Sequence, residues 1–146
     1  MDNHSIAEEI NIAAPIEEVF DLVTDPYKVP LVMPGLVEIN NIVGMPFKVG
    51  STCHFVFKMF GINTGGDWTV KVLDRPTKYE SDTVGDQVST WTYNLQSENG
   101  VTVLQVIIRY HVPTSLLGKV DGYILKPIND GYLKLYLNNI KQLLEK

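Results

Sequence analysis

The chain has 146 residues, of which 45% are hydrophobic and 20% are charged, and its net charge is −5. This length and composition predict a single domain over residues 1–146 with a substantial core, and they exclude a disordered or low-complexity protein. An acidic surface repels phosphate backbones, so we expect no nucleic-acid partner. No apolar run is long enough to span a bilayer, so we expect no membrane insertion. The first five residues lack the basic start of a signal peptide, and we expect a cytoplasmic protein.

The N-terminal part of the chain predicts one strand followed by two short helices. Residues 5–12 alternate between apolar and polar, with Glu8 on the otherwise apolar face. Pro15 suits the first turn of a helix, which an apolar stripe at helical spacing continues and an Asp-Pro pair ends. Residues 27–33 are mostly apolar and close at a Pro-Gly pair, which indicates a second short helix.

Six further strands are predicted between turn-rich breaks. The Asn-Gly pair at 99–100, between two alternating runs, is a strong hairpin signal. Consecutive hairpins of this kind imply an antiparallel meander. The predicted strands cover residues 36–43, 51–60, 64–74, 78–84, 87–97 and 101–112.

A long helix is predicted from 116 to 144, after Pro113 stops the last strand. Pro127 kinks or divides it. The helix is more apolar than a surface helix needs, so much of it must be covered. A curved sheet wrapped around this helix buries both the helix and one face of the sheet.

Side-chain alternation assigns one face of each strand to the interior. In the strand 64–74 it places Trp68, Val70 and Val72 inside. Both tryptophans and several tyrosines fall on this inner face, and aromatic walls with hydroxyl tips are typical of a pocket for an amphipathic ligand. Alternatively, they are core aromatics whose polar tips find partners within the protein. The expected ligand-binding residues are Phe55, Phe57, Trp68, Tyr79, Trp91, Tyr93 and Tyr110 on the sheet and Ile124 and Ile128 on the helix.

A shift of one residue in strand register would swap these faces. His54, or Arg109 with His111, would then point inward and form a constellation suited to catalysis or to orienting an anion. This alternative stays open from the sequence alone.

The order of several short motifs resembles the START-like superfamily, which includes polyketide cyclases and dehydrases, coenzyme Q-binding proteins and plant pathogenesis-related proteins. The resemblance implies an α+β helix-grip fold, in which a seven-stranded antiparallel sheet wraps around a long C-terminal helix, with two short helices after strand 1. It also implies a hydrophobic cavity, but it defines fold better than activity. The motifs are Ile10 to Phe20, Asp25-Pro26, Met33-Pro34-Gly35, Gly66-Asp67-Trp68, Asp74-Arg75-Pro76 and Tyr110 to Pro113.

Familiar enzyme motifs are absent from the sequence, so we assign no catalytic residue. The histidines are far apart, and Cys53 and His54 point to opposite faces of one strand, so we expect no metal site and no cofactor. The single cysteine also has no partner for an internal disulfide. Glu8 is the one carboxylate on an inward face, and a position at the rim is the ordinary place for such a group.

Three functions remain compatible with the sequence. We favour a protein that binds a hydrophobic or amphipathic small molecule, such as a lipid, a quinone or a polyketide-like compound, as a monomer or weak dimer. The alternative is an enzyme of the polyketide cyclase, aromatase or dehydratase type that uses the same cavity without a metal or nucleotide cofactor. A module that acts through its surface is the third. The glycine-containing segments 61–66 and 113–122 are the expected mouth of the cavity.

Overall fold

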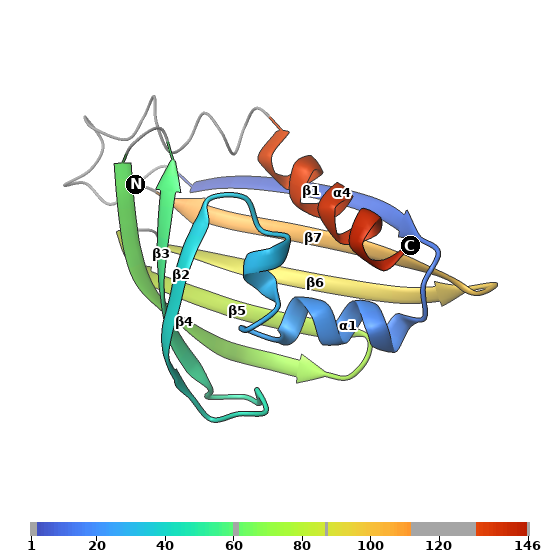
Figure 1. Cartoon of the computed structure of the whole chain (residues 1–146), viewed down its shortest axis with the longest axis horizontal. Coiled ribbons are helices and arrows are strands. Elements are labelled where there is room, and N and C mark those ends of the chain that lie inside the picture. The colour runs from blue at the N-terminus through green and yellow to red at the C-terminus, as the bar shows by residue number, and fades with distance from the viewer. Residues whose placement is uncertain (1–2, 60–61, 87, 112–130, 146) are drawn as a thin grey trace.

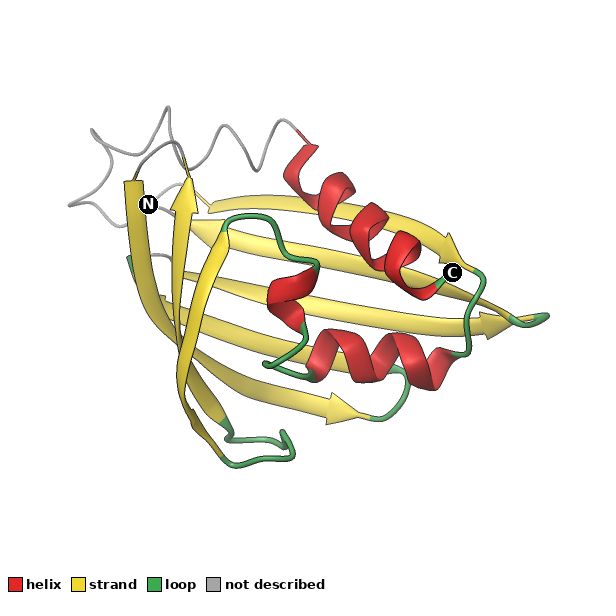
Figure 2. Cartoon of the chain, in the orientation of Figure 1, coloured by secondary structure: helices red, strands yellow, loops and turns green. Residues whose placement is uncertain are grey.

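The computed structural model describes residues 3–59, 62–86, 88–111 and 131–145. The expected helical residues Ile124 and Ile128 lie outside the described residues, as does the expected mouth segment 113–122. The described residues form a curved antiparallel sheet with the helices on its inner face (Figures 1 and 2).

The sheet has seven strands in the order β1-β7-β6-β5-β4-β3-β2, and every neighbouring pair is antiparallel. This confirms the meander predicted from consecutive hairpins, with β1 added beside β7. The strands are β1 (Asn3–Ile12), β2 (Leu36–Val43), β3 (Thr52–Met59), β4 (Ile62–Asp74), β5 (Lys78–Gly85), β6 (Val88–Glu98) and β7 (Val101–His111).

The turn between β6 and β7 shows why the sequence pattern was informative. Asn99 has a φ of 52° and Gly100 a φ of 82°, so both central residues lie in the left-handed region. A two-residue hairpin turn of this hand needs positive φ at both positions, which asparagine and glycine adopt at the least cost. The Asn-Gly pair therefore fixes the register of β6 and β7, which share the longest run of paired residues in the sheet.

One helix follows β1 as predicted, but the second is much shorter than expected. Helix α1 (Ile16–Thr24) buries Val19 and Phe20 against the sheet. In place of a helix over 27–33, the structure has a single 3-10 turn, η1 (Val29–Leu31). Proline is tolerated only in the first turn of a helix, and prolines at 30 and 34 therefore leave room for one turn between them.

Helix α4 (Leu133–Leu144) is the described part of the predicted terminal helix. It lies over the inner face of the sheet, against β1 and beside α1 (Figure 2). Its buried side chains are spaced at three and four residues, as one face of a helix requires. They are Leu133, Tyr136, Leu137 and Ile140.

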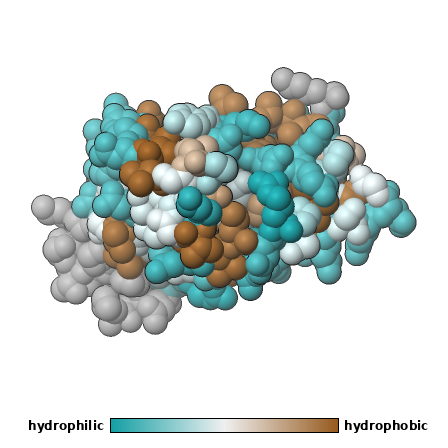
Figure 3. Space-filling model, turned by 90° about the horizontal axis from the view of Figure 1, so that it is seen from below, coloured by the Kyte–Doolittle hydropathy of each residue, from teal (hydrophilic) through white to brown (hydrophobic). Residues whose placement is uncertain are grey.

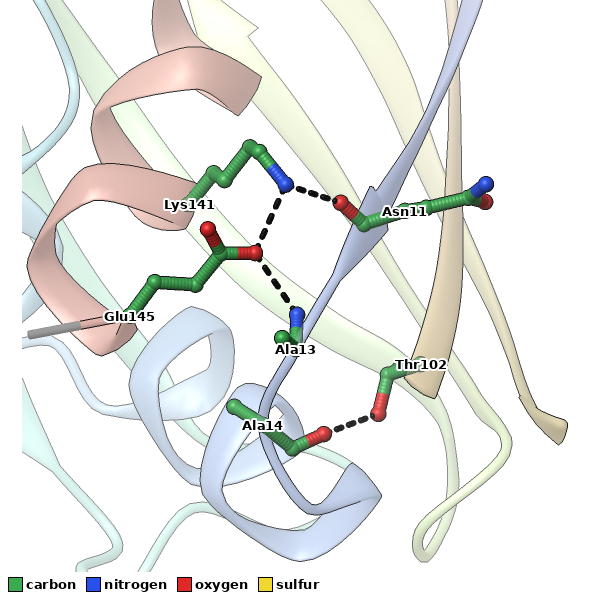
Figure 4. A network of polar contacts seen from close by, with 6 residues as sticks. All are labelled: Asn11, Ala13, Ala14, Thr102, Lys141 and Glu145. Atoms are coloured by element: carbon green, nitrogen blue, oxygen red, sulfur yellow. Dashed lines mark hydrogen bonds and ion pairs between the residues drawn. The ribbon is translucent and has the colours of Figure 1, made fainter. Parts of the chain in front are cut away.

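The C-terminal end of α4 is fastened to the end of β1 (Figure 4). The carboxylate of Glu145 accepts a hydrogen bond of 2.7 Å from the backbone N–H of Ala13. The ammonium of Lys141 donates to the same carboxylate at 2.6 Å and to the carbonyl of Asn11 at 2.7 Å. These bonds join segments 130 and more residues apart, and they set the position of the helix over the sheet.

The faces of the strands are those that alternation predicted, with one exception in β4. Val70 is opposite Ser81 in β5, but the next pair is Val72 with Glu80, so a β-bulge separates them. The bulge adds a residue and reverses the alternation beyond it. The prediction that Val72 faces inward is therefore wrong, and Leu73, opposite Tyr79, packs against the core instead.

Several large apolar side chains remain exposed, among them Leu31 at 70% and Tyr27 at 67%. On the face seen in Figure 3, hydrophobic surface is divided into patches by hydrophilic residues. In the described ranges, no helix is long and apolar enough to cross a membrane.

Candidate ligand-binding site

Strands β4, β5 and β6 bring the predicted aromatic residues together by direct cross-strand pairing. Residues opposite each other on antiparallel strands share a face of the sheet. Trp68 is opposite Thr83, Ser81 is opposite Trp91, and Tyr79 is opposite Tyr93. All six side chains are buried on the inner face.

A small cavity lies over this part of the inner face. Its volume is about 20 Å³, within a wider space of about 360 Å³ that is partly open to solvent. The smaller volume corresponds to about one water molecule. Most of the wall is apolar, and a serine, a threonine and a tyrosine are among the residues that form it. The wall consists of Met33, Leu36, Phe55, Phe57, Trp68, Ser81, Thr83, Trp91 and Tyr93.

The segment from η1 to β2 closes one side of the cavity with Met33 and Leu36. Two side chains of the C-terminal region hold this segment in place. Tyr132 donates its hydroxyl to the carbonyl of Pro34 at 2.6 Å, and Asn139 donates its amide to the carbonyl of Val32 at 2.9 Å. The position of the segment thus depends on where α4 lies.

Below the cavity, the indole N–H of Trp68 donates to the hydroxyl of Tyr79 at 3.0 Å. Tyr79 is 1% exposed and packs against Tyr93, with 5.2 Å between ring centroids. Tyr79 is absent from the cavity wall, so its hydroxyl holds Trp68 in place from behind.

A second pair of polar tips joins the sheet to the helix. The hydroxyl oxygens of Tyr93 in β6 and Tyr136 in α4 are 2.9 Å apart and form a buried hydrogen bond. The two rings meet edge to face with centroids 6.5 Å apart, and Tyr136 also contacts Trp91 edge to face at 6.1 Å. Tyr93 borders the cavity, whereas Tyr136 lies behind it.

The other polar groups of the wall are also hydrogen-bonded. The indole N–H of Trp91 donates to the hydroxyl of Ser89 at 3.0 Å, and that hydroxyl lies 2.6 Å from the hydroxyl of Thr83. Among the described residues, every buried side-chain nitrogen and oxygen has a partner. The aromatic polar tips are therefore satisfied within the protein, as the core-aromatic alternative expected.

Burial raises the pKa of several tyrosine hydroxyls and of the cysteine thiol in this region. It raises the pKa of Tyr79, Tyr93 and Tyr136 above the usual value for a phenol, because a buried tyrosinate loses its hydration. Burial, reinforced by the nearby charge of Asp67, raises the pKa of the Cys53 thiol to about 12. These hydroxyls and this thiol are neutral at physiological pH.

A separate hollow, with a volume of about 440 Å³ against about 20 Å³ for the cavity, lies where β1 and β6 begin and where β5 and β7 end. Tyr110 borders it and stacks on the imidazole of His4, with ring centroids 5.2 Å apart. Arg109, Asp82 and several hydroxyl side chains also line it, so it is more polar than the cavity. Thr83 and Ser89 border this hollow from the inner face.

The predicted site residues are therefore only partly gathered in one place. Tyr79 lies beneath the cavity, and Tyr110 borders the separate hollow. The cavity wall contains the other five described residues, namely Phe55, Phe57, Trp68, Trp91 and Tyr93.

Sequence reasoning missed three groups of residues in and around the site. Met33 and Leu36 come from a segment whose position depends on distant hydrogen bonds, and no local pattern indicates it. Tyr132 and Tyr136 are four residues apart on one face, a spacing that could have marked them as buried. Ser81 and Thr83 were predicted to face inward, and they do so, but they were not assigned to the site.

The alternative with swapped faces does not occur in the described part of the sheet. His54 is opposite Asp67, with 3.1 Å between its Nδ1 and the carboxylate, and its side chain is 37% exposed. Arg109 is exposed on the outer face. Of the expected mouth segment 61–66, residues 62–66 belong to β4 and pair with β3, rather than forming a loop. The described chain gathers no three His, Cys, Asp or Glu side chains that could hold a metal ion.

A curved seven-stranded antiparallel sheet around a C-terminal helix, with an apolar cavity on the inner face of the sheet, defines the helix-grip class of proteins. Comparison with known families places the chain within that class. Residues 3–145 match the family described as polyketide cyclase / dehydrase and lipid transport. The chain belongs to this family, which confirms the resemblance drawn from the sequence motifs. No curated protein matches the chain by sequence.

Solved structures of diverse proteins share the fold. The Zhui aromatase/cyclase from Streptomyces sp. R1128 is 12% identical, with a TM-score of 0.81 over 99% of this chain and 94% of that chain. Norcoclaurine synthase from Thalictrum flavum, in complex with a transition-state analogue, is 17% identical, with a TM-score of 0.70 over 98% and 94%. Ginseng major latex-like protein 151 from Panax ginseng is 12% identical, with a TM-score of 0.74 over 99% of each chain. Identities this low show the fold alone.

Proposed function

We propose that this protein binds a hydrophobic or amphipathic small molecule, of the size of a lipid tail, a quinone or a polyketide-like compound, between its sheet and its C-terminal helix. The observation that supports this most is the cavity wall, which combines apolar and aromatic side chains with a serine, a threonine and a tyrosine. Ligand sites commonly combine apolar walls with a small number of polar groups that fix orientation.

The cavity must enlarge to receive such a ligand, because its present volume corresponds to about one water molecule. Of the segment that carries Met33 and Leu36, the part before Gly35 can move at modest cost, because the carbonyl of Gly35 accepts from the backbone N–H of Lys58 and Leu36 is paired with Phe57 in the sheet. Two hydrogen bonds tie its carbonyls to side chains of the C-terminal region. Each contributes about 1 kcal/mol of net stability, so ligand contacts can offset their loss.

Binding is favoured over catalysis by the acid–base character of the wall. A general base must lose its proton near the working pH. Burial raises the pKa of Tyr93 well above that range, and the same effect acts on Tyr136 behind it. These groups can orient a ligand by donating hydrogen bonds, but they are poorly suited to abstract a proton.

The test uses the two tryptophans of the chain, both of which border the cavity. An uncharged fluorescent probe, phenylnaphthylamine, is titrated into the protein while the indoles are excited. Binding in the cavity places the probe beside both indoles, so we expect saturable energy transfer with quenching of tryptophan emission. Native mass spectrometry of protein from its own host, with organic extraction, then identifies any resident ligand.

A pair of matched variants distinguishes the cavity from the surface. Ser81→Leu fills the cavity, and we expect it to weaken probe binding by about tenfold or more, equivalent to about 1.4 kcal/mol. Ser97→Leu makes the same change at an exposed position of β6 and should leave binding unchanged. Probe binding that Ser81→Leu does not alter, or no saturable binding by the unmodified protein, would contradict the proposal.

A further inference from the structure

The chemistry of the cavity wall carries information about the ligand's charge. Of the described residues that form the wall, none has a formal charge: four are hydrocarbon or thioether side chains, two are indoles, and three carry hydroxyls. A carboxylate placed there would lose its hydration with no cation from these residues to replace it. Burying an unpaired charge costs far more than burying a polar group that makes one hydrogen bond.

The pKa values of the protein's own tyrosines reflect the same cost of burying a charge. Tyr93, at the wall, and Tyr136 and Tyr79, behind it, all have a raised pKa, and burial is the largest cause for each. Each shift means that this region disfavours a negative charge on oxygen. A ligand anion at the same place meets the same cost, whereas a ketone, ester or quinone oxygen does not.

The Tyr93–Tyr136 pair supplies a hydrogen-bond donor for such an oxygen. Two hydroxyls carry two protons, and the single bond between them, 2.9 Å long, uses one. Either hydroxyl can donate in this bond, so the second proton lies on Tyr93 when Tyr136 is the donor, and Tyr93 is the member of the pair that belongs to the cavity wall. A chain of two hydroxyls also polarises its terminal donor, which strengthens the bond it makes.

The size of the cavity agrees with this role. Its present volume suits one water-sized group, which is also the size of a carbonyl oxygen. Phe57, Trp68 and Trp91 surround the same space, so an aromatic or conjugated carbonyl compound would find ring faces and edges beside it.

We propose that the Tyr93–Tyr136 hydroxyl pair recognises a ligand's uncharged carbonyl oxygen, and that the cavity selects neutral carbonyl compounds over carboxylates. This inference rests on the proposed function and adds the chemical class of the ligand.

Three small ligands with one ring system test this selection by displacing phenylnaphthylamine at neutral pH. They are naphthyl methyl ketone, ethylnaphthalene and naphthoate, which differ in one substituent at the same ring position. We expect the ketone to bind roughly fivefold more tightly than the hydrocarbon, the effect of one hydrogen bond. We expect naphthoate to bind at least about tenfold more weakly than the ketone.

Tyr93→Phe keeps the ring and removes the donor, so it should abolish the ketone's advantage over ethylnaphthalene and leave the hydrocarbon's affinity unchanged. Tyr79→Phe makes the same change beneath the cavity, next to Trp68, and should preserve that advantage. Probe binding by both folded variants, measured alongside thermal melts, shows that each retains the cavity.

The possible outcomes separate this inference from the proposed function. If the probe binds but the ketone has no advantage, or Tyr93→Phe leaves that advantage intact, the tyrosine pair is not the recognition element. If naphthoate binds as tightly as the ketone, the selection against anions is wrong while ligand binding stands. If the probe does not bind at all, the proposed function itself fails, and this inference fails with it.

Discussion

The buried hydrogen bond between Tyr93 and Tyr136 allows an asymmetric prediction about stability. Tyr93→Phe leaves the hydroxyl of Tyr136 without its partner, and Tyr136 is fully buried behind the cavity. Tyr136→Phe leaves the hydroxyl of Tyr93, which borders a space large enough for about one water molecule. A water can replace the lost partner in the second variant but not in the first.

The magnitudes follow from the cost of a buried polar group without a partner. That cost is about 1–3 kcal/mol, whereas a hydrogen bond exchanged for one to water changes stability by about 1 kcal/mol or less. We therefore expect Tyr93→Phe to lower the free energy of unfolding by about 2 kcal/mol and Tyr136→Phe by about 1 kcal/mol. The double variant removes both partners and should cost less than the sum of the two.

Urea unfolding followed by circular dichroism measures these differences, with the slope of each curve checked for two-state behaviour. Equal losses in the two single variants would show that the cavity does not rescue Tyr93. A larger loss for Tyr136→Phe, or strict additivity in the double variant, would refute the assignment of these two hydroxyls as a coupled pair.

Three further predictions concern other parts of the molecule. A Cβ on Gly66 would lie 2.1 Å from the carbonyl oxygen of Val84, so Gly66→Ala should destabilise the chain by roughly 3 kcal/mol or more. A Cβ on Gly65 has its nearest contact at 3.3 Å, so Gly65→Ala should lower the free energy of unfolding clearly less in the same urea experiment. The thiol of Cys53, buried and with its pKa raised to about 12, should react with Ellman's reagent near pH 8 only after urea unfolds the chain; fast reaction of the folded protein would contradict its burial. Hydrogen bonds from Ala13 and Lys141 lower the pKa of Glu145 below its usual value of 4.5, so the stability they contribute is present above pH 4.5 and lost as the pH falls through the folded value. Glu145→Gln should thus be less stable than the unmodified chain at pH 7, and the difference in their free energies of unfolding should disappear in acid. A difference that does not depend on pH would show that the charge of Glu145 is not its cause.

Local patterns predicted the parts of the fold that depend on neighbouring residues. The Asn99-Gly100 pair defined the last hairpin because positive φ at both positions is a local requirement, and the structure has that turn. Alternation then assigned the buried face of β5, β6 and β7 correctly, since successive side chains of a strand point to opposite faces. The same alternation failed past Val70, because a β-bulge adds a residue without a clear local signal.

The candidate site was predictable only as a set of inward aromatic residues. Trp68, Trp91 and Tyr93 face the interior because their strands alternate, and the sequence by itself determined this much, together with the family to which the chain belongs. Tertiary structure decided which of them meet around one space, that Tyr110 borders a different hollow, and that Met33 and Leu36 close the cavity. The partner of Tyr93, Tyr136, lies 43 residues away on α4. Periodicity gives each element its buried face, but the pairing of one face with another depends on how the helix is fastened across the sheet, and only the folded chain contains that information.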